Sequence, residues 1–205
     1  MAKILLVRHG ETEKNSSQRY WGKTDVNLGP VGLRQAEQLR DRLAATRIDY
    51  VYSSEMRRAV LTARTIASIH GLSEACYPEL REIDFGQIEG LNFTEVQQQF
   101  PKVARMWIER DPALSYPNGE SLAQLDFRLS IFRNRLIQHG ENEVVMVVAH
   151  SGVLRTLICQ LLGLETRNRW DFRIDLASLS IVETFSGAAV LSLLNDTSHL
   201  LDGCK

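Results

Sequence analysis

Arg8 and His9 follow directly on the apolar run Ile4–Val7 near the start of the chain. An unprotonated imidazole is a nucleophile, and the planar guanidinium group beside it offers paired donors that match phosphate oxygens. Ligands bind at the carboxyl ends of strands in open α/β sheets, so a histidine placed there faces a crevice. The alternative is an ordinary turn in which His9 is a hydrogen-bonded surface residue.

Two more segments end in groups that carry or could carry positive charge. The short β-rich run 50–52 leads through two serines to Arg57 and Arg58, and His150 follows the apolar run 144–149. Taken singly, the arginines could simply open a helix and His150 could cap the next one. Cations that meet at one edge of a sheet are more informative, because like charges converge only where an anion compensates them.

Glu82 is the fourth candidate, and it lies just before a stretch, from about residue 86 to residue 119, that lacks the strand–helix alternation of the rest of the chain. It could be a solvated surface charge. Beside the cations described above, it could instead exchange protons with a ligand.

The elements that must position these groups alternate between strand and helix patterns. Helical spacing of apolar residues predicts helices from Pro30 to near Arg47, from Met56 to His70, from Ser121 to His139, and from Val153 to Leu162. Residues 144–149 are apolar without alternation, which is typical of a strand buried on both faces. Residues 178–185 and 188–194 flank Ser186-Gly187 as a hairpin. We therefore predict a three-layer α/β/α sandwich with a mostly parallel central sheet and a C-terminal hairpin.

The stretch from about residue 86 to residue 119 does not fit this alternation. Residues 92–100 and 102–110 read as short helices broken by Pro101, and a loop containing proline and glycine follows. We expect this helical excursion to form a lid over a site.

Length and composition exclude several classes of protein. The 205 residues are 44% hydrophobic and 24% charged, which predicts one ordinary globular domain over 1–205. The net charge of −1 gives no global attraction for nucleic acid or acidic membranes. No apolar stretch approaches the roughly 18 residues of a membrane span, so we expect a cytoplasmic protein. Cys76, Cys159 and Cys204 form no ligand pattern, and we expect no disulfide framework, metal site or cofactor.

Four motifs in register resemble the histidine phosphatase superfamily, the phosphoglycerate-mutase-like proteins. They are Arg8-His9-Gly10-Glu11-Thr12 with Asn15, Ser53-Ser54-Glu55-Met56-Arg57-Arg58-Ala59, Leu80-Arg81-Glu82 with Phe85-Gly86 and Glu89-Gly90, and Ala149-His150-Ser151-Gly152-Val153-Leu154-Arg155. The resemblance implies that His9 is the phosphorylated nucleophile, that Arg8, Arg58 and His150 form the phosphate pocket, and that Glu82 is the proton donor. Arg58 is chosen over Arg57 because it directly precedes the alanine of the family pattern.

These roles set requirements on protonation. His9 must be neutral to attack phosphorus, and nearby arginines together with a backbone acceptor on its other ring nitrogen would favour that form. His150 is expected to be a cation against the phosphoryl oxygens. Glu82 must give a proton to the leaving oxygen and can then activate the water that hydrolyses the phosphohistidine.

Segments 85–91, 117–122 and 170–175 look like those of α-ribazole phosphatases and related broad-specificity phosphatases. The resemblance implies hydrolysis of a small-molecule phosphate monoester, with α-ribazole 5'-phosphate of cobalamin synthesis as the leading candidate. We expect the substrate pocket between residues 20–22 and the excursion, with apolar walls from Trp21, Phe85, Trp107 and Tyr116. For Phe85 and Trp107 the alternative is core packing. The remaining candidate substrate contacts are Asn15, Gly22 and Ser151.

Two other functions stay open at this point. A cofactor-dependent phosphoglycerate mutase would use the same phosphohistidine, but this chain has Glu82-Ile83-Asp84-Phe85-Gly86 where such mutases carry Glu-Arg-His-Tyr-Gly. A non-catalytic phosphoryl-binding module would be expected to have lost one of the five catalytic residues. The apolar edge strand near the C-terminus allows a homodimer without requiring one.

Overall fold

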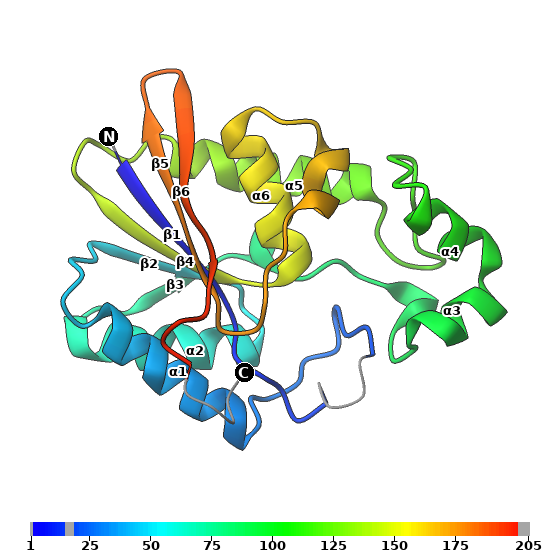
Figure 1. The fold of residues 1–205 in the computed structure, drawn as a ribbon, viewed down its shortest axis with the longest axis horizontal. Coiled ribbons are helices and arrows are strands. Elements are labelled where there is room, and N and C mark those ends of the chain that lie inside the picture. Colours follow the sequence, from blue (N-terminus) through cyan, green and yellow to red (C-terminus); the bar gives the residue numbers. More distant parts are fainter. Residues whose placement is uncertain (1, 15–18, 201–205) are drawn as a thin grey trace.

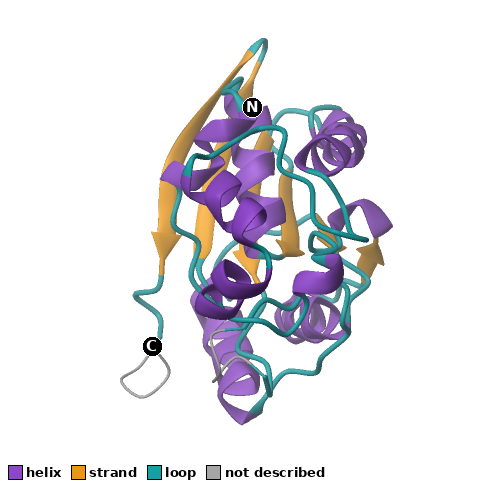
Figure 2. Ribbon diagram, turned by 90° about the vertical axis from the view of Figure 1, so that its right-hand side faces the viewer, coloured by secondary structure: helices purple, strands orange, loops and turns teal. Residues whose placement is uncertain are grey.

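The computed structural model of the protein describes residues 2–14 and 19–200. Its sheet has the strand order β3-β2-β4-β1-β5-β6. The strands are β1 (Ala2–Arg8), β2 (Tyr50–Ser53), β3 (Glu74–Cys76), β4 (Val144–Ala149), β5 (Leu179–Phe185) and β6 (Ala188–Asp196). The pairs β1–β4, β4–β2 and β2–β3 are parallel, whereas β5 runs antiparallel to β1 and to β6. The predicted mostly parallel sheet and C-terminal hairpin are confirmed, and β6 forms one edge of the sheet (Figure 2).

Helices cover both faces of the sheet. Figure 1 shows α1 (Pro30–Leu43) and α2 (Arg57–Ala67) on one side, and α5 (Leu122–Leu136) and α6 (Ser151–Leu162) on the other. Ser121 begins α5 with the capping box that its sequence favours, since its side chain accepts from the Gln124 N–H. None of the described helices is long and apolar enough to cross a membrane.

Several helix boundaries differ from the predictions: α5 ends at Leu136 rather than His139, and α2 ends at Ala67 with η2 (Ser68–His70) after it. Helix α1 ends at Leu43 rather than near Arg47, because the hydrogen bond from the Thr46 N–H to the Leu43 carbonyl tightens the chain into a turn before β2. Helix α6 begins at Ser151, two residues earlier than predicted, so its first turn starts immediately after β4.

Alternate residues of the central strands enter two separate cores. In β1, Ile4 and Leu6 pack with α5 and α6, whereas Leu5 and Val7 pack with α1 and α2. Strand β4 is divided in the same way, which explains its unbroken apolar sequence. This burial on both faces confirms the three-layer sandwich.

The excursion over 86–119, here called the lid, projects beyond the end of the sheet (Figure 1). It contains a short 3₁₀ helix, η4 (Gly86–Ile88), followed by α3 (Phe93–Gln99) and α4 (Pro101–Ile108). Asn92 caps α3 reciprocally with Glu95, and Pro101 occupies the first turn of α4, where its missing N–H costs nothing. The two predicted lid helices are thus present. The remaining 3₁₀ helices are η2 (Ser68–His70), η3 (Pro78–Leu80) and η5 (Thr166–Asp171).

Candidate active site

The carboxyl ends of β2, β4 and β1 lie side by side at one edge of the sheet. Arg8 pairs in register with Ala149, and Ser53 pairs with Val148. The His9 N–H donates to the Ala149 carbonyl at 3.1 Å, which fixes His9 directly beside the end of β4. The three predicted strand exits therefore meet at one place.

His9 is held as a neutral ring. It is 6% exposed, and its Nδ1 lies 2.7 Å from the Gly10 carbonyl oxygen. A carbonyl can only accept, so Nδ1 carries the proton and Nε2 keeps its lone pair. Burial, followed by the charges of Arg58 and Arg8, lowers the pKa of His9 well below its ordinary value. These are the properties of a nitrogen nucleophile.

Arg58 is buried in the first turn of α2 and is fixed through all three of its nitrogen positions. Nη2 donates to the Gly22 carbonyl at 2.8 Å, Nη1 to the Thr24 carbonyl at 2.9 Å, and Nε to Nδ1 of His150 at 3.2 Å. Burial lowers the pKa of Arg58. Arg57, in contrast, is exposed and pairs with Asp25, as expected for the member of this pair that faces solvent.

Gly22 supports Arg58 through its backbone. A Cβ at this position would lie 1.9 Å from the carbonyl oxygen of Ile83, so only glycine allows the loop to approach so closely. Gly22 was predicted as a substrate contact, and in the structure its carbonyl oxygen accepts a hydrogen bond from Arg58.

Arg8 completes the cationic side of the site. Its Nη1 donates to the Ile174 carbonyl at 2.7 Å. Burial lowers the pKa of Arg8 to about 10, so it remains a cation at neutral pH.

His150 was predicted to be a cation against the phosphoryl oxygens, and its contacts within the protein are those of a neutral ring. This residue is fully buried, its Nδ1 accepts from Arg58, and its Nε2 lies 2.9 Å from Ser54 Oγ. Burial, then the charges of Arg58 and His9, lowers the pKa of His150 well below its ordinary value. Only an anion beside the ring would raise that pKa again. His150 also makes no side-chain cap for α6.

Glu82 is not a freely solvated charge. Its carboxylate accepts from the Gly152 N–H at 3.1 Å and from the Ile83 N–H at 3.0 Å. The first turn of α6 thereby places Glu82 on the same cavity as His9.

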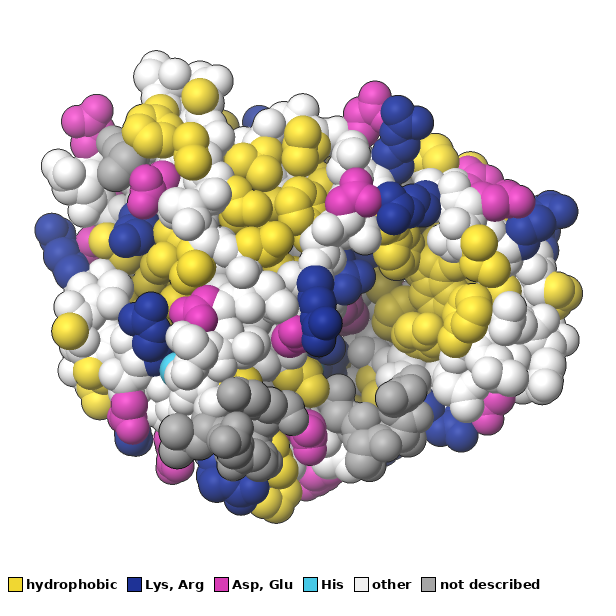
Figure 3. Space-filling model, in the orientation of Figure 1, with side chains coloured by type: hydrophobic (Ala, Val, Ile, Leu, Met, Phe, Trp, Pro, Cys, Tyr) yellow, Lys and Arg dark blue, Asp and Glu magenta, His cyan; other side chains and the backbone are white. Residues whose placement is uncertain are grey.

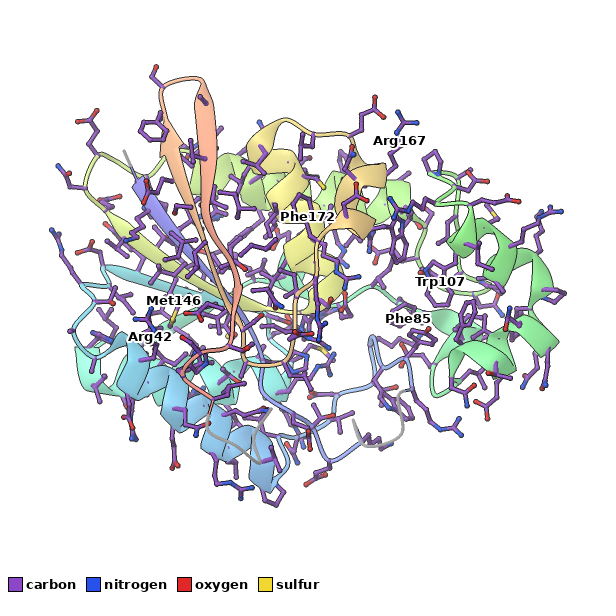
Figure 4. The ribbon with its side chains drawn as sticks, viewed as in Figure 1. Arg42, Phe85, Trp107, Met146, Arg167 and Phe172 are labelled. Carbon is purple, nitrogen blue, oxygen red and sulfur yellow. The ribbon has the colours of Figure 1, made fainter. Side chains whose placement is uncertain are left out.

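A cavity of about 310 Å³ lies between residues 19–22 and the lid, where the substrate pocket was predicted. Its aromatic lining is Tyr20, Trp21, Phe85, Trp107, Tyr116 and Trp170. Figure 4 shows Phe85 next to Trp107 of α4, and their ring centroids are 6.3 Å apart. Both residues also pack against the core, so the pocket-wall and core-packing interpretations each hold in part. Ser151 lines the cavity, whereas Asn15 lies outside the described residues.

The surface is hollowed between basic side chains near its centre and hydrophobic side chains over the lid (Figure 3). The arginines of the cavity are Arg8, Arg19, Arg58, Arg155 and Arg169. Our sequence reasoning gave no role to Arg19, Arg155 or Arg169. The place of Arg155 in the site could have been predicted, because it follows Ser151 by four residues and so shares a face of α6 with it. The place of Arg169 could not have been predicted in this way, because the residues of η5 show no helical spacing of apolar side chains.

The fold and the site together define a class of protein. A neutral histidine held between arginines at the edge of a parallel sheet is an arrangement for phosphoryl transfer. A family model described as histidine phosphatase superfamily (branch 1) matches residues 4–197, and the chain belongs to this superfamily. It is a phosphatase.

The relatives of the chain are named for different substrates. The chain is 35% identical to phosphoserine phosphatase 1 of Hydrogenobacter thermophilus, over 98% of this chain and 95% of that protein. It is 32% identical to the adenosylcobalamin/alpha-ribazole phosphatase of Escherichia coli, over 94% and 95%. The crystal structure of the alpha-ribazole phosphatase from Shigella flexneri superposes with a TM-score of 0.86 at 31% identity, covering 95% of this chain and 96% of that one.

Proposed function

We propose that the protein hydrolyses small phosphate monoesters through a phosphohistidine formed on His9. The observation that carries this proposal is the neutral His9 ring, with Nδ1 committed to the Gly10 carbonyl and with Arg8 and Arg58 beside it. The two guanidinium groups would hold the phosphoryl oxygens, and the free Nε2 would face phosphorus.

In the first step, Nε2 of His9 attacks phosphorus as the bond to the ester oxygen breaks. Glu82 gives its proton to that oxygen, which leaves as an alcohol. The charge on the phosphoryl oxygens stays balanced by Arg8 and Arg58, and a phosphate beside His150 would favour its cationic form.

In the second step, the Glu82 carboxylate takes a proton from water and the oxygen attacks phosphorus. The P–N bond breaks, inorganic phosphate leaves, and His9 returns to its neutral form. Glu82 thus serves as acid and then as base, and each cycle ends with both groups in their starting states.

The substrate predicted from the sequence is α-ribazole 5'-phosphate or a related small molecule. The aromatic lining of the cavity supports a planar leaving group such as a benzimidazole riboside. Two of the relatives described above are named alpha-ribazole phosphatases. Another relative is named for phosphoserine. The homodimer predicted from the C-terminal edge strand and the cytoplasmic location stay predictions.

The covalent mechanism is tested with His9→Ala and p-nitrophenyl phosphate. We expect loss of steady-state hydrolysis to background, and we expect wild-type enzyme quenched during turnover of ³²P-labelled substrate to carry an acid-labile, base-stable label. His70→Ala, at the end of η2, is the matched control and should keep both activity and label. Hydrolysis above background by the His9→Ala variant would sink the mechanism.

The two alternative functions give different results in the same assays. A mutase depends on a bisphosphate primer, so steady release of phosphate from 3-phosphoglycerate without primer would exclude it. A non-catalytic binding module would release no phosphate from p-nitrophenyl phosphate.

A further inference from the structure

Two arginines in the cavity take no part in the proposed chemistry and have buried nitrogens without a hydrogen bond. The guanidinium group of Arg169 lies 5.2 Å from the ring centroid of its neighbour Trp170. Arg169, on η5, is 3% exposed, and its Nε and Nη1 are buried without a hydrogen bond. Nε of Arg155, on α6, is also buried without a hydrogen bond. Elsewhere in the described chain, the partly buried guanidinium group of Arg128 has a carboxylate partner, Glu120, at 2.6 Å. A buried guanidinium group without an acceptor is costly unless a ligand supplies one.

The charges of the cavity do not balance against a phosphate group alone. Arg19 is neutralised by Glu95, which leaves Arg8, Arg58, Arg155 and Arg169 facing the single carboxylate of Glu82. In the proposed first step Glu82 is protonated, so a phosphate dianion would neutralise only two of these four positive charges. A further negative charge on the substrate would lower the excess that remains.

The position of Arg169 shows which part of the substrate would carry that charge. A Cβ built on Gly152 would lie 3.2 Å from Nη2 of Arg169 and 2.6 Å from Oε1 of Glu82, so both side chains meet over the first turn of α6. Glu82 is the proposed donor to the leaving oxygen. Arg169 is therefore on the leaving-group side of the site. Arg155 lines the same cavity from α6, one turn after Ser151.

We propose that Arg155 and Arg169 form a subsite for a carboxylate on the leaving group, which makes phosphate esters of small hydroxy acids and hydroxy amino acids the preferred substrates. A guanidinium fork matches a carboxylate in geometry as well as in charge. A benzimidazole riboside carries no anion and would leave both arginines unpaired. This inference rests on the proposed hydrolase activity and selects among its substrates.

The test compares substrates that differ in the carboxylate alone. O-phosphoserine and O-phosphoethanolamine share the ester and the ammonium group, and 3-phosphoglycerate and glycerol 3-phosphate repeat the contrast without nitrogen. For the wild type we expect kcat/KM to favour the carboxylate in each pair by at least about tenfold, the effect of one charge-assisted interaction. Arg169→Gln and, separately, Arg155→Gln should bring both ratios toward one.

Arg167→Gln is the matched control. This arginine belongs to the same η5 segment, is exposed, pairs with Glu165 and points away from the cavity (Figure 4). Its ratios should equal those of the wild type. Because Arg155 is only half-buried, its variant keeps the test decisive if Arg169→Gln does not fold.

Wild-type ratios near one, ratios unchanged in both cavity variants, or a higher kcat/KM for α-ribazole 5'-phosphate would each overturn the subsite. In those cases His9-dependent hydrolysis of p-nitrophenyl phosphate would still stand, which separates this inference from the proposed function. An enzyme that hydrolyses none of these esters would overturn both.

Discussion

At the scale of single residues, Arg58 depends on the shape of its side chain. It reaches two backbone carbonyl oxygens and a ring nitrogen of His150 at once, and each contact uses a different nitrogen. A lysine carries the same charge on one nitrogen and could satisfy only part of this set. The remaining acceptors would stay buried without a donor.

We therefore expect Arg58→Lys to lower kcat/KM for p-nitrophenyl phosphate by about 100-fold, because a bidentate phosphate contact and some of the hydrogen bonds that position it are lost. The neighbouring Arg57→Lys is the control, since Arg57 is exposed and pairs with Asp25 on the surface. Equal activity of the two variants would remove Arg58 from the phosphate pocket.

The sequence could predict the neutral state of His9 but not that of His150. The acceptor for His9 is the carbonyl of the very next residue, so it follows from the local motif. The ring of His150 instead meets Arg58 and Ser54, more than 90 residues away in the chain. Its pKa is set by packing that local patterns do not reveal.

At the scale of elements, Glu89 at the start of the lid organises the loop that holds Arg58. Its carboxylate accepts from the Gly22 N–H at 2.8 Å, from the Lys23 N–H at 3.0 Å and from the Thr24 hydroxyl at 2.7 Å. The carbonyls of Gly22 and Thr24 are the ones that Arg58 donates to. Lid, loop and phosphate pocket are thus joined by one carboxylate.

Glu89→Gln replaces one acceptor oxygen with an amide that faces N–H donors, so part of this set is lost. We expect kcat/KM to fall by about tenfold and competitive inhibition by inorganic phosphate to weaken by a similar factor, since both depend on the position of Arg58. Glu109→Gln, an exposed glutamate at the end of α4, should change neither value. A loss of thermal stability without weaker phosphate inhibition would reduce Glu89 to a structural role.

The elements themselves were largely predictable because their signals are local. Unbroken apolar runs, the Ser121 cap and Pro101 each act within a few residues. The supporting role of Glu89 was not predictable, although its motif was recognised, because it depends on how the lid meets residues 22–24. Arg169 was missed for the same reason, since only the tertiary fold brings η5 to the cavity.

At the scale of the whole molecule, the buried histidines make folding sensitive to pH. Burial lowers the pKa values of His9 and His150 well below 6.5 in the native state, whereas in the unfolded chain both return to about 6.5. Below that pH the unfolded chain binds protons that the native protein does not. The free energy of unfolding therefore falls as the pH drops below about 6.5, and it is independent of these two groups above it.

His9→Gln removes one of the two groups and keeps a polar side chain of similar size. In urea titrations without phosphate, between about pH 6.5 and pH 5.5, we expect the free energy of unfolding of the wild type to fall more steeply than that of the variant by up to about 1.4 kcal/mol per pH unit, the value for one proton. Above pH 7 the two curves should run parallel, because neither state then takes up a proton on His9. Parallel curves at acidic pH as well would mean that His9 is protonated in the native protein, and the neutral nucleophile would have to be given up.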